Sequence, residues 1–271
     1  MLLDTKFHIR KDIEDHLSIP YLGDIPHSEC VDKVIVKKDT RTSTAEAFRI
    51  LRTNLNFMLP NTSEGSRGKV LFLTSTISGE GKSFVSINLA ATLALTNKKV
   101  LLLGLDLRAP KITEYLGITD RKGITNYILD DKLHVDDLKF TIPEVENVDF
   151  ISSGLIPPNP SELLSNIRVK ELFEIVKKDY DFVIVDTAPI SLVTDTLLIS
   201  EFADIFLYVV RANFLDRKML IVPKTLYNEN KLPNMAIVLN DTDSKKGYGY
   251  GYGYIQSNKK PFYKRFFGLS E

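Results

Sequence analysis

Five short runs of consecutive apolar residues constrain the fold of this chain more than any other feature. They are separated by stretches in which apolar residues recur with helical spacing. Strands without polar alternation are buried on both faces, and strands that alternate with helices form mostly parallel sheets. The runs are Val70–Leu73, Val100–Leu103, Phe182–Val185, Ile205–Val210 and Ala236–Leu239. The sequence therefore predicts an α/β protein with helices on both faces of a mostly parallel sheet.

The composition limits the classes of partner and cofactor. Lys and Arg together number 35, as do Asp and Glu, so no overall basic field favours a nucleic-acid partner. Cys30 is the only cysteine and the four histidines lie far apart, which argues against a disulfide and against a zinc site. No stretch approaches the roughly 18 apolar residues that span a bilayer. We expect a soluble chain from a reducing compartment.

Composition also divides the chain into three regions. Residues 1–40 are polar and turn-rich, which predicts an extended lead-in arm. Residues 41–243 contain all five apolar runs and form the predicted main domain. Residues 244–271 begin with alternating glycine and tyrosine, a pattern that cannot build a core and predicts a flexible tail.

Two helices can be predicted within the main domain. Apolar residues recur at helical spacing over Thr44–Met58, which predicts one amphipathic helix. The second is expected to begin with Asn159 as the N-cap, Pro160 at the first helical position and Glu162 reaching back, and to run to about Lys178.

A candidate phosphate-binding loop follows the first apolar run. The segment Thr74–Ser83 opens a helix, and this strand–loop–helix context is the one that a phosphate loop requires. Its two glycines let backbone N–H groups turn inward, and the helix N-terminus adds a positive dipole end. Thr76 stands where the strict motif has glycine. The sequence thus predicts a P-loop NTPase fold that binds ATP and Mg²⁺.

The nucleotide is expected to contact this loop directly. The predicted binding residues are Ser78, Gly79, Glu80, Gly81, Lys82, Ser83 and Phe84. The lysine would neutralise the outer phosphates, and the serine hydroxyl would bind Mg²⁺. Arg211 and Asn240, which follow the last two strands, are weaker candidates for contact with the base or ribose, because loop residues there are equally often structural.

Two aspartates follow predicted strands. Asp186 closes the run Phe182–Val185, and Asp106 follows Val100–Leu103. Because the carboxyl ends of parallel strands meet at one edge of a sheet, both are expected near the phosphate loop as magnesium ligands beside Ser83. The alternative is that each carboxylate caps the turn after its strand.

Arg108 has two possible roles. Its guanidinium either stabilises phosphate charge or pairs with a neighbouring carboxylate. The candidate catalytic residues are Lys82, Asp106, Arg108 and Asp186.

These segments resemble the bacterial tyrosine kinases of capsule and exopolysaccharide export, the BY-kinase family. The resemblance covers nearly the whole chain. The matching segments are Thr74–Ser83 (Walker A), Leu101–Pro110 (Walker A′), Asp181–Pro189 (Walker B) and Gly154–Leu164, which is similar to a family stretch between these motifs. The resemblance implies an ATP-dependent protein-tyrosine autokinase.

The resemblance also implies acceptors and an oligomer. The implied phosphate acceptors are Tyr248, Tyr250, Tyr252, Tyr254 and Tyr263, presented to a neighbouring subunit in a ring. Glu46, Arg49 and Arg52 match the helix by which relatives close that ring. It further implies a place at the cytoplasmic face of the bacterial inner membrane, with a transmembrane co-polymerase portion, a tyrosine phosphatase and the polysaccharide export machinery as partners.

One departure from the family pattern keeps other functions open. Gly104 occupies the first of two aspartate positions in Walker A′, so the chain uses another base, relies on electrostatics or acts slowly. A MinD/ParA-like switch ATPase is one alternative, although Ile77 and Ser78 replace its signature lysine and glycine. A nucleotide-controlled assembly scaffold with little kinase activity is the other.

Overall fold

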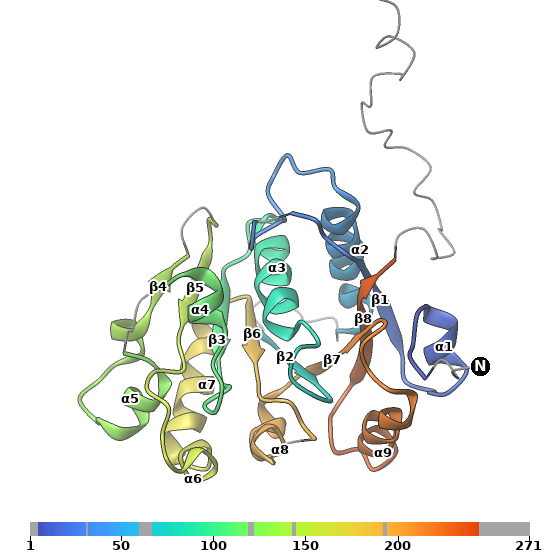
Figure 1. The fold of residues 1–271 in the computed structure, drawn as a ribbon. Coiled ribbons are helices and arrows are strands. Elements are labelled where there is room, and N and C mark those ends of the chain that lie inside the picture. Colours follow the sequence, from blue (N-terminus) through green and yellow to red (C-terminus); the bar gives the residue numbers. More distant parts are fainter. Residues whose placement is uncertain are drawn as a thin grey trace, which may run out of the picture.

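The chain folds around one eight-stranded sheet with helices on both faces (Figure 1). The computed structural model describes residues 5–30, 32–59, 67–118, 122–142, 145–191 and 194–243. The strand order is β1-β8-β7-β2-β6-β3-β5-β4, and every neighbouring pair is parallel except β4 with β5. This arrangement confirms the predicted α/β class.

The strands include all five predicted apolar runs. The bounds are β1 Tyr21–Pro26, β2 Lys69–Ser75, β3 Val100–Gly104, β4 Phe140–Thr141, β5 Val148–Ile151, β6 Phe182–Asp186, β7 Ile205–Arg211 and β8 Met235–Thr242. Sequence reasoning missed β1, β4 and β5. β1 and β4 are the two edge strands of the sheet, and β4 and β5 are short, with 2 and 4 residues.

In the described part of the chain, the α-helices have between 4 and 16 residues. They are α1 Arg10–Glu14, α2 Ser43–Met58, α3 Lys82–Ala94, α4 Ile112–Leu116, α5 Ile124–Leu129, α6 Pro160–Leu164, α7 Ile167–Asp179, α8 Asp195–Leu198 and α9 Ile221–Asn228, with 3₁₀ turns at Val135–Leu138, Ser200–Phe202 and Arg217–Leu220. The helix predicted over residues 44–58 is α2.

The helix predicted from residue 159 to about 178 is wrong in one respect, because it is two helices. It breaks between α6 and α7, where Asn166 has extended backbone angles and its side chain accepts a hydrogen bond from the Arg168 amide. Asn159 makes no side-chain capping bond. A second N-cap inside a helical pattern therefore ended the first helix early.

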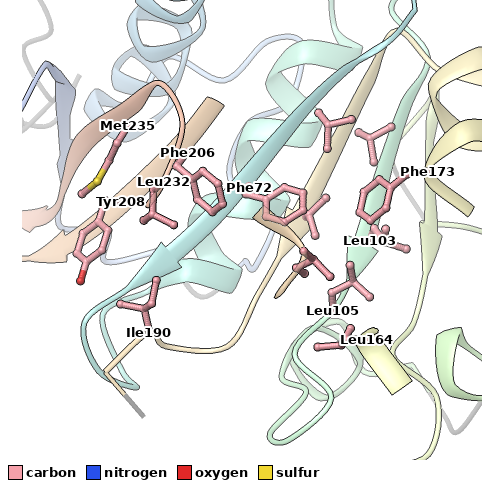
Figure 2. Close-up of a cluster of buried hydrophobic side chains, with 14 of the residues drawn as sticks. Phe72, Leu103, Leu105, Leu164, Phe173, Ile190, Phe206, Tyr208, Leu232 and Met235 are labelled. Atoms are coloured by element: carbon pink, nitrogen blue, oxygen red, sulfur yellow. The ribbon is translucent and has the colours of Figure 1, made fainter. Parts of the chain in front are cut away.

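Hydrophobic side chains fill both faces of the sheet. Phe72 on β2 packs against Phe173 of α7 and Phe206 of β7, with ring centroids 5.9 and 5.1 Å apart (Figure 2). The next residue on each side of Phe72 points to the opposite face, so Leu71 and Leu73 belong to the cluster under α2 and α3. Successive residues of one strand thus serve two cores.

The N-terminal segment is packed onto the sheet rather than extended throughout. Phe7 is fully buried, its carbonyl accepts a hydrogen bond from the Asn213 amide, and β1 pairs in parallel with β8.

The domain boundary at residue 40 stays a prediction. The predicted tail at residues 244–271 lies outside the described residues, and within them no helix is long and apolar enough to cross a membrane.

Two phenylalanines on α2 provide a matched test of this packing. Phe48 is fully buried against Phe84, whereas Phe57 is 84% exposed. Phe48→Ala should lower the free energy of unfolding by about 3–5 kcal/mol because it leaves a cavity. Phe57→Ala should change it by less than about 0.5 kcal/mol. Urea denaturation measures both, and equal effects would contradict this packing.

Candidate active site

The loop between β2 and α3 has the backbone shape of a phosphate cradle. Gly79 and Gly81 both have φ of +91°, a left-handed conformation that side chains disfavour. A Cβ on Gly81 would lie 2.1 Å from Nδ2 of Asn240, so any other residue there would displace the Asn240 side chain. The loop therefore depends on glycine at position 81 for two independent reasons.

Lys82 and Ser83 begin the helix that follows this loop. The Lys82 side chain is nearly buried, and its ammonium group donates to Oγ of Ser75 over 3.1 Å. This contact places the ammonium group beside Ser75, where β2 ends and the loop begins. A positive charge held in this way is available to an anion bound at the α3 N-terminus.

Asp186, at the end of β6, faces the first turn of α3. Its Oδ2 accepts from Ser83 Oγ at 2.8 Å and its Oδ1 from Ser86 Oγ at 3.1 Å. Burial raises the pKa of Asp186 to about 6, although Lys82 and Ser83 act in the opposite direction. The predicted meeting of Ser83 and Asp186 at one sheet edge is therefore present in the structure.

Asp106 adopts a turn-capping geometry. Its Oδ1 accepts from the amides of Arg108 and Ala109 at 3.1 and 2.9 Å, and the side chain is largely buried. Both this carboxylate and Asp186 line a small recess that also includes Gly104. Asp106 thus caps the turn after β3 and also lies beside Asp186. Whether Asp106 also binds a metal stays a prediction.

Arg108 forms an ion pair with Asp195. Its Nε and Nη2 bond the two carboxylate oxygens of Asp195 at 2.7 and 3.0 Å, and Nη2 also reaches Oγ of Ser161. Of the two roles considered for Arg108, the structure shows pairing with a neighbouring carboxylate. The bidentate pair connects the loop after β3 to α8, and the bond to Ser161 connects it to α6.

Gly104 lies opposite Asp186 in the β3–β6 ladder. A Cβ at this position would lie 3.3 Å from the backbone nitrogen of Ser153, which is a tight contact. The chain after β5 therefore passes close to the position where the family pattern has a carboxylate. Here the backbone fills part of the space that a side chain would take.

Arg211 and Asn240 contact the phosphate loop from the ends of β7 and β8. Arg211 donates from Nη1 to the Gly79 carbonyl at 3.1 Å and pairs through Nε with Asp241 at 2.9 Å. Asn240 donates from Nδ2 to the Glu80 carbonyl at 3.0 Å. Both side chains therefore hold the outer turn of the loop in place.

An open recess of about 660 Å³ adjoins this turn, with Arg211 and Asn240 in its wall. Sequence reasoning missed several of its other residues, namely His27, Cys30, Tyr115 and Asp241. Only Asp241 had a signal in the sequence, because it follows Asn240 directly at a strand end. The others come from segments that are remote along the chain.

The remaining loop residues differ in orientation. Ser78 is exposed, whereas Phe84 packs against Phe48 and lines the recess. Glu80 is fully buried although it lies between two glycines of the cradle, and its Oε2 accepts from the Ile77 amide at 2.8 Å. Its carboxyl group thus lies inside the loop, away from solvent.

The predicted interface residues on α2 are engaged within the chain. Arg49 bonds the Glu46 carboxylate and the Thr40 carbonyl, the latter at 2.7 Å. Arg52 donates to the Thr92 carbonyl at 2.9 Å. Their role in an oligomer stays a prediction. The five predicted acceptor tyrosines lie outside the described residues.

Comparison with known proteins assigns most of the chain to recognised groups. Residues 68–216 match the family described as AAA domain. The putative tyrosine-protein kinase EpsB of Ralstonia nicotianae is 33% identical over 74% of this chain. The matched part is 28% of the length of that protein. The tyrosine-protein kinase CpsD of Streptococcus agalactiae is 35% identical over 73% of this chain and 82% of that protein.

A solved structure with the same fold is the kinase domain of the Escherichia coli tyrosine kinase ETK. It matches with a TM-score of 0.74 and 30% identity, over 90% of this chain and 98% of that one.

Two glycines offer a matched test of the loop geometry. Gly117 has φ of +67° with nothing near its Cβ position, whereas Gly81 combines positive φ with the contact to Asn240. Gly117→Ala should cost about 1 kcal/mol of folding free energy for the backbone alone. Gly81→Ala should cost roughly 1 kcal/mol more, because Asn240 loses its hydrogen bond. Thermal unfolding compares them, and equal costs would contradict the steric argument.

Proposed function

This chain belongs to the bacterial tyrosine-protein kinases, and we propose that it is a kinase domain that transfers phosphate from ATP to tyrosine, including tyrosines of its own C-terminal segment. The observation that carries the proposal is the convergence of Lys82, Ser83 and Asp186 on the glycine cradle after β2. This arrangement supplies anion binding and metal-binding oxygens at one sheet edge.

The residues of the cradle fit a nucleotide with a divalent cation. The positive φ of Gly79 and Gly81 gives the loop a turn in which backbone amides can face phosphate oxygens. Ser83, Asp106 and Asp186 are the proposed contacts for Mg²⁺, which would neutralise phosphate charge when bound. Within the described residues no group of three His, Cys, Asp or Glu could hold a metal alone.

The transfer itself needs positioning and charge neutralisation. The tyrosine oxygen forms the new bond to the γ-phosphorus while the bond to the ADP oxygen breaks, and the phenol loses its proton. Lys82 is proposed to stabilise the charge that develops on the leaving oxygen. Arg108 is proposed to act through Asp195, by fixing the loop that carries Asp106.

Because Gly104 has no carboxylate, another group must accept the proton of the tyrosine hydroxyl. Asp106 and Asp186 are the carboxylates that line the recess at Gly104, and we propose that one of them, or water, takes the proton. A loose transition state makes a strong base unnecessary, because the bond from phosphorus to the leaving oxygen is largely broken before the bond to the phenol oxygen forms. The chain is therefore proposed to be an active kinase despite this glycine.

The nucleoside end is proposed to occupy the recess beside Arg211 and Asn240. These two side chains already hold the carbonyls of Gly79 and Glu80, so they are placed where the cradle opens. The recess offers both aromatic and polar walls, including Tyr115. Such a mixture suits a base and a ribose.

We propose that the kinase works as a ring in which each tail reaches a neighbouring active site. The acceptors are proposed to be Tyr248, Tyr250, Tyr252, Tyr254 and Tyr263. Each phosphate adds about −1.5 to −2 charges, so a modified tail would repel its neighbours and loosen the ring. The α2 residues Glu46, Arg49 and Arg52 are the proposed contacts between subunits.

The cellular setting is proposed from the relatives. One relative is named as a putative tyrosine-protein kinase in the cps region of Klebsiella pneumoniae. We propose that this domain acts at the cytoplasmic face of the inner membrane, with a transmembrane co-polymerase portion of the same or a paired protein. A tyrosine phosphatase and the polysaccharide export machinery complete the proposed partners.

Autophosphorylation can be measured directly. Incubation with Mg²⁺-ATP should add phosphates in steps of about 80 Da, each the mass of one phosphoryl group, to the tyrosine-rich segment. Intact mass spectrometry records them, and Lys82→Met should abolish them because the outer phosphates lose their cation. ATP hydrolysis without added mass would favour a switch ATPase, and binding without turnover a scaffold.

The proposed ring can be tested on α2. Triple replacement of Glu46, Arg49 and Arg52 by alanine should convert the nucleotide-bound oligomer to monomers in light scattering. The control is replacement of Glu229 and Lys231, an exposed ion pair that follows α9, which should leave the oligomer intact. An unchanged oligomer in the triple variant would exclude this interface, provided that its melting temperature shows a folded chain.

A further inference from the structure

A buried carboxyl group inside the phosphate loop is not used by the chemistry described above. Glu80 has no exposed surface, and its Oε1 has no hydrogen-bond partner among the described residues. Its other oxygen, Oε2, holds the Ile77 amide at 2.8 Å. An acid group in such a place is costly to ionise, because water is excluded and one oxygen is left unsatisfied.

Buried side chains of the loop, β7 and β8 surround Glu80. Thr76, which replaces the first glycine of the strict motif, bonds through Oγ1 to the Tyr208 hydroxyl at 2.9 Å. Both side chains are fully buried. Above them, Asn240 holds the Glu80 carbonyl. Glu80 is thus fixed by both its backbone and its side chain under the turn that would face phosphate.

The charged groups that face Glu80 come from two elements. Lys82 at the start of α3 favours the ionised carboxylate, as do the backbone amides of Ile77, Arg211 and Thr76. Tyr208 on β7 stays a neutral phenol, because burial and the nearby Glu80 raise its pKa. Burial of Glu80 outweighs the favourable contacts and raises its pKa to about 7.

We propose that Glu80 is a proton-linked positioning residue of the phosphate loop, whose neutral form favours nucleotide binding and whose ionised form opposes it. The inference rests on the proposed nucleotide site, but not on which acceptor receives the phosphate. Two effects act in the same direction. An ionised Glu80 places a negative charge under the phosphates, and it competes with them for Lys82.

The sign of the pH dependence follows from linkage. A polyanion that binds better to the protonated carboxyl must raise its pKa further, so binding takes up a proton. Nucleotide affinity should then fall as pH rises through about 7, where the free carboxyl titrates. Below that range Glu80 is neutral in both states, and this source of pH dependence disappears.

Calorimetry of Mg²⁺-ADP binding measures this linkage. Titrations at pH 7 in two buffers with different ionisation enthalpies count the protons taken up. If binding raises the pKa by one unit, the wild type should take up about 0.4 proton more per nucleotide than Glu80→Gln. With the same one-unit shift, its dissociation constant should rise about sevenfold more than that of the variant between pH 6 and pH 8.5.

Glu80→Gln is a matched control because glutamine keeps the size of the side chain and cannot ionise. Titration of the nucleotide and of Asp186 contributes equally to both proteins and cancels in the difference. Equal proton counts and equal pH profiles would overturn the proposal, even if the tail is phosphorylated. Absence of nucleotide binding to the wild type would overturn both this proposal and the proposed function.

A second measurement covers failure of the variant to fold. The ¹³C signal of the Glu80 carboxyl in the wild type reports its titration with and without Mg²⁺-ADP. A midpoint near pH 7 that moves to higher pH on binding supports the proposal. A midpoint that stays in place, or a carboxyl that is ionised throughout, overturns it.

Discussion

The parallel register of β2 and β6 is the constraint on which the site depends. It pairs Leu73 with Asp186, so the loop that leaves β2 begins beside the carboxylate that ends β6. One further turn of chain brings Ser83 within 2.8 Å of that carboxylate. Because backbone hydrogen bonds of a buried parallel sheet fix this register, the phosphate loop and its acidic partner need no long side chains to meet.

The outer turn of the loop depends on the other half of the sheet. Arg211 and Asn240 leave the ends of β7 and β8 and hold the carbonyls of Gly79 and Glu80. Asp241 joins Arg211 to His27, at the end of the N-terminal strand β1. The loop is therefore supported by a network that reaches the sheet edge on which the N-terminal segment packs.

Sequence patterns predicted the interior of the fold better than its edges. The five apolar runs became the five central strands, because a strand that is buried on both faces consists of consecutive apolar residues. The missed strand β5 includes Asp149, which accepts a hydrogen bond from Tyr180, and β1 includes a glycine and a proline. Such residues are tolerated where strands are short or lie at an edge, and they interrupt the apolar run by which a strand is recognised in the sequence.

The same limit applies to the site. The common location of the glycines, Lys82, Ser83 and Asp186 could be predicted, because strand–loop–helix order brings them to one edge of the sheet. The ion pair of Arg108 could not be predicted, since its partner Asp195 lies on a segment that is remote in sequence. Local spacing carries no information about a contact across 87 positions.

The sequence by itself determined the α/β architecture, the phosphate loop and its carboxylate, because each follows from local pattern and strand order. Only the tertiary structure decided which side chains support the loop. It turned Glu80 inward beneath Asn240 and paired Arg211 with Asp241. These contacts join chain segments through packing and exclusion of water, and both depend on how all the strands assemble.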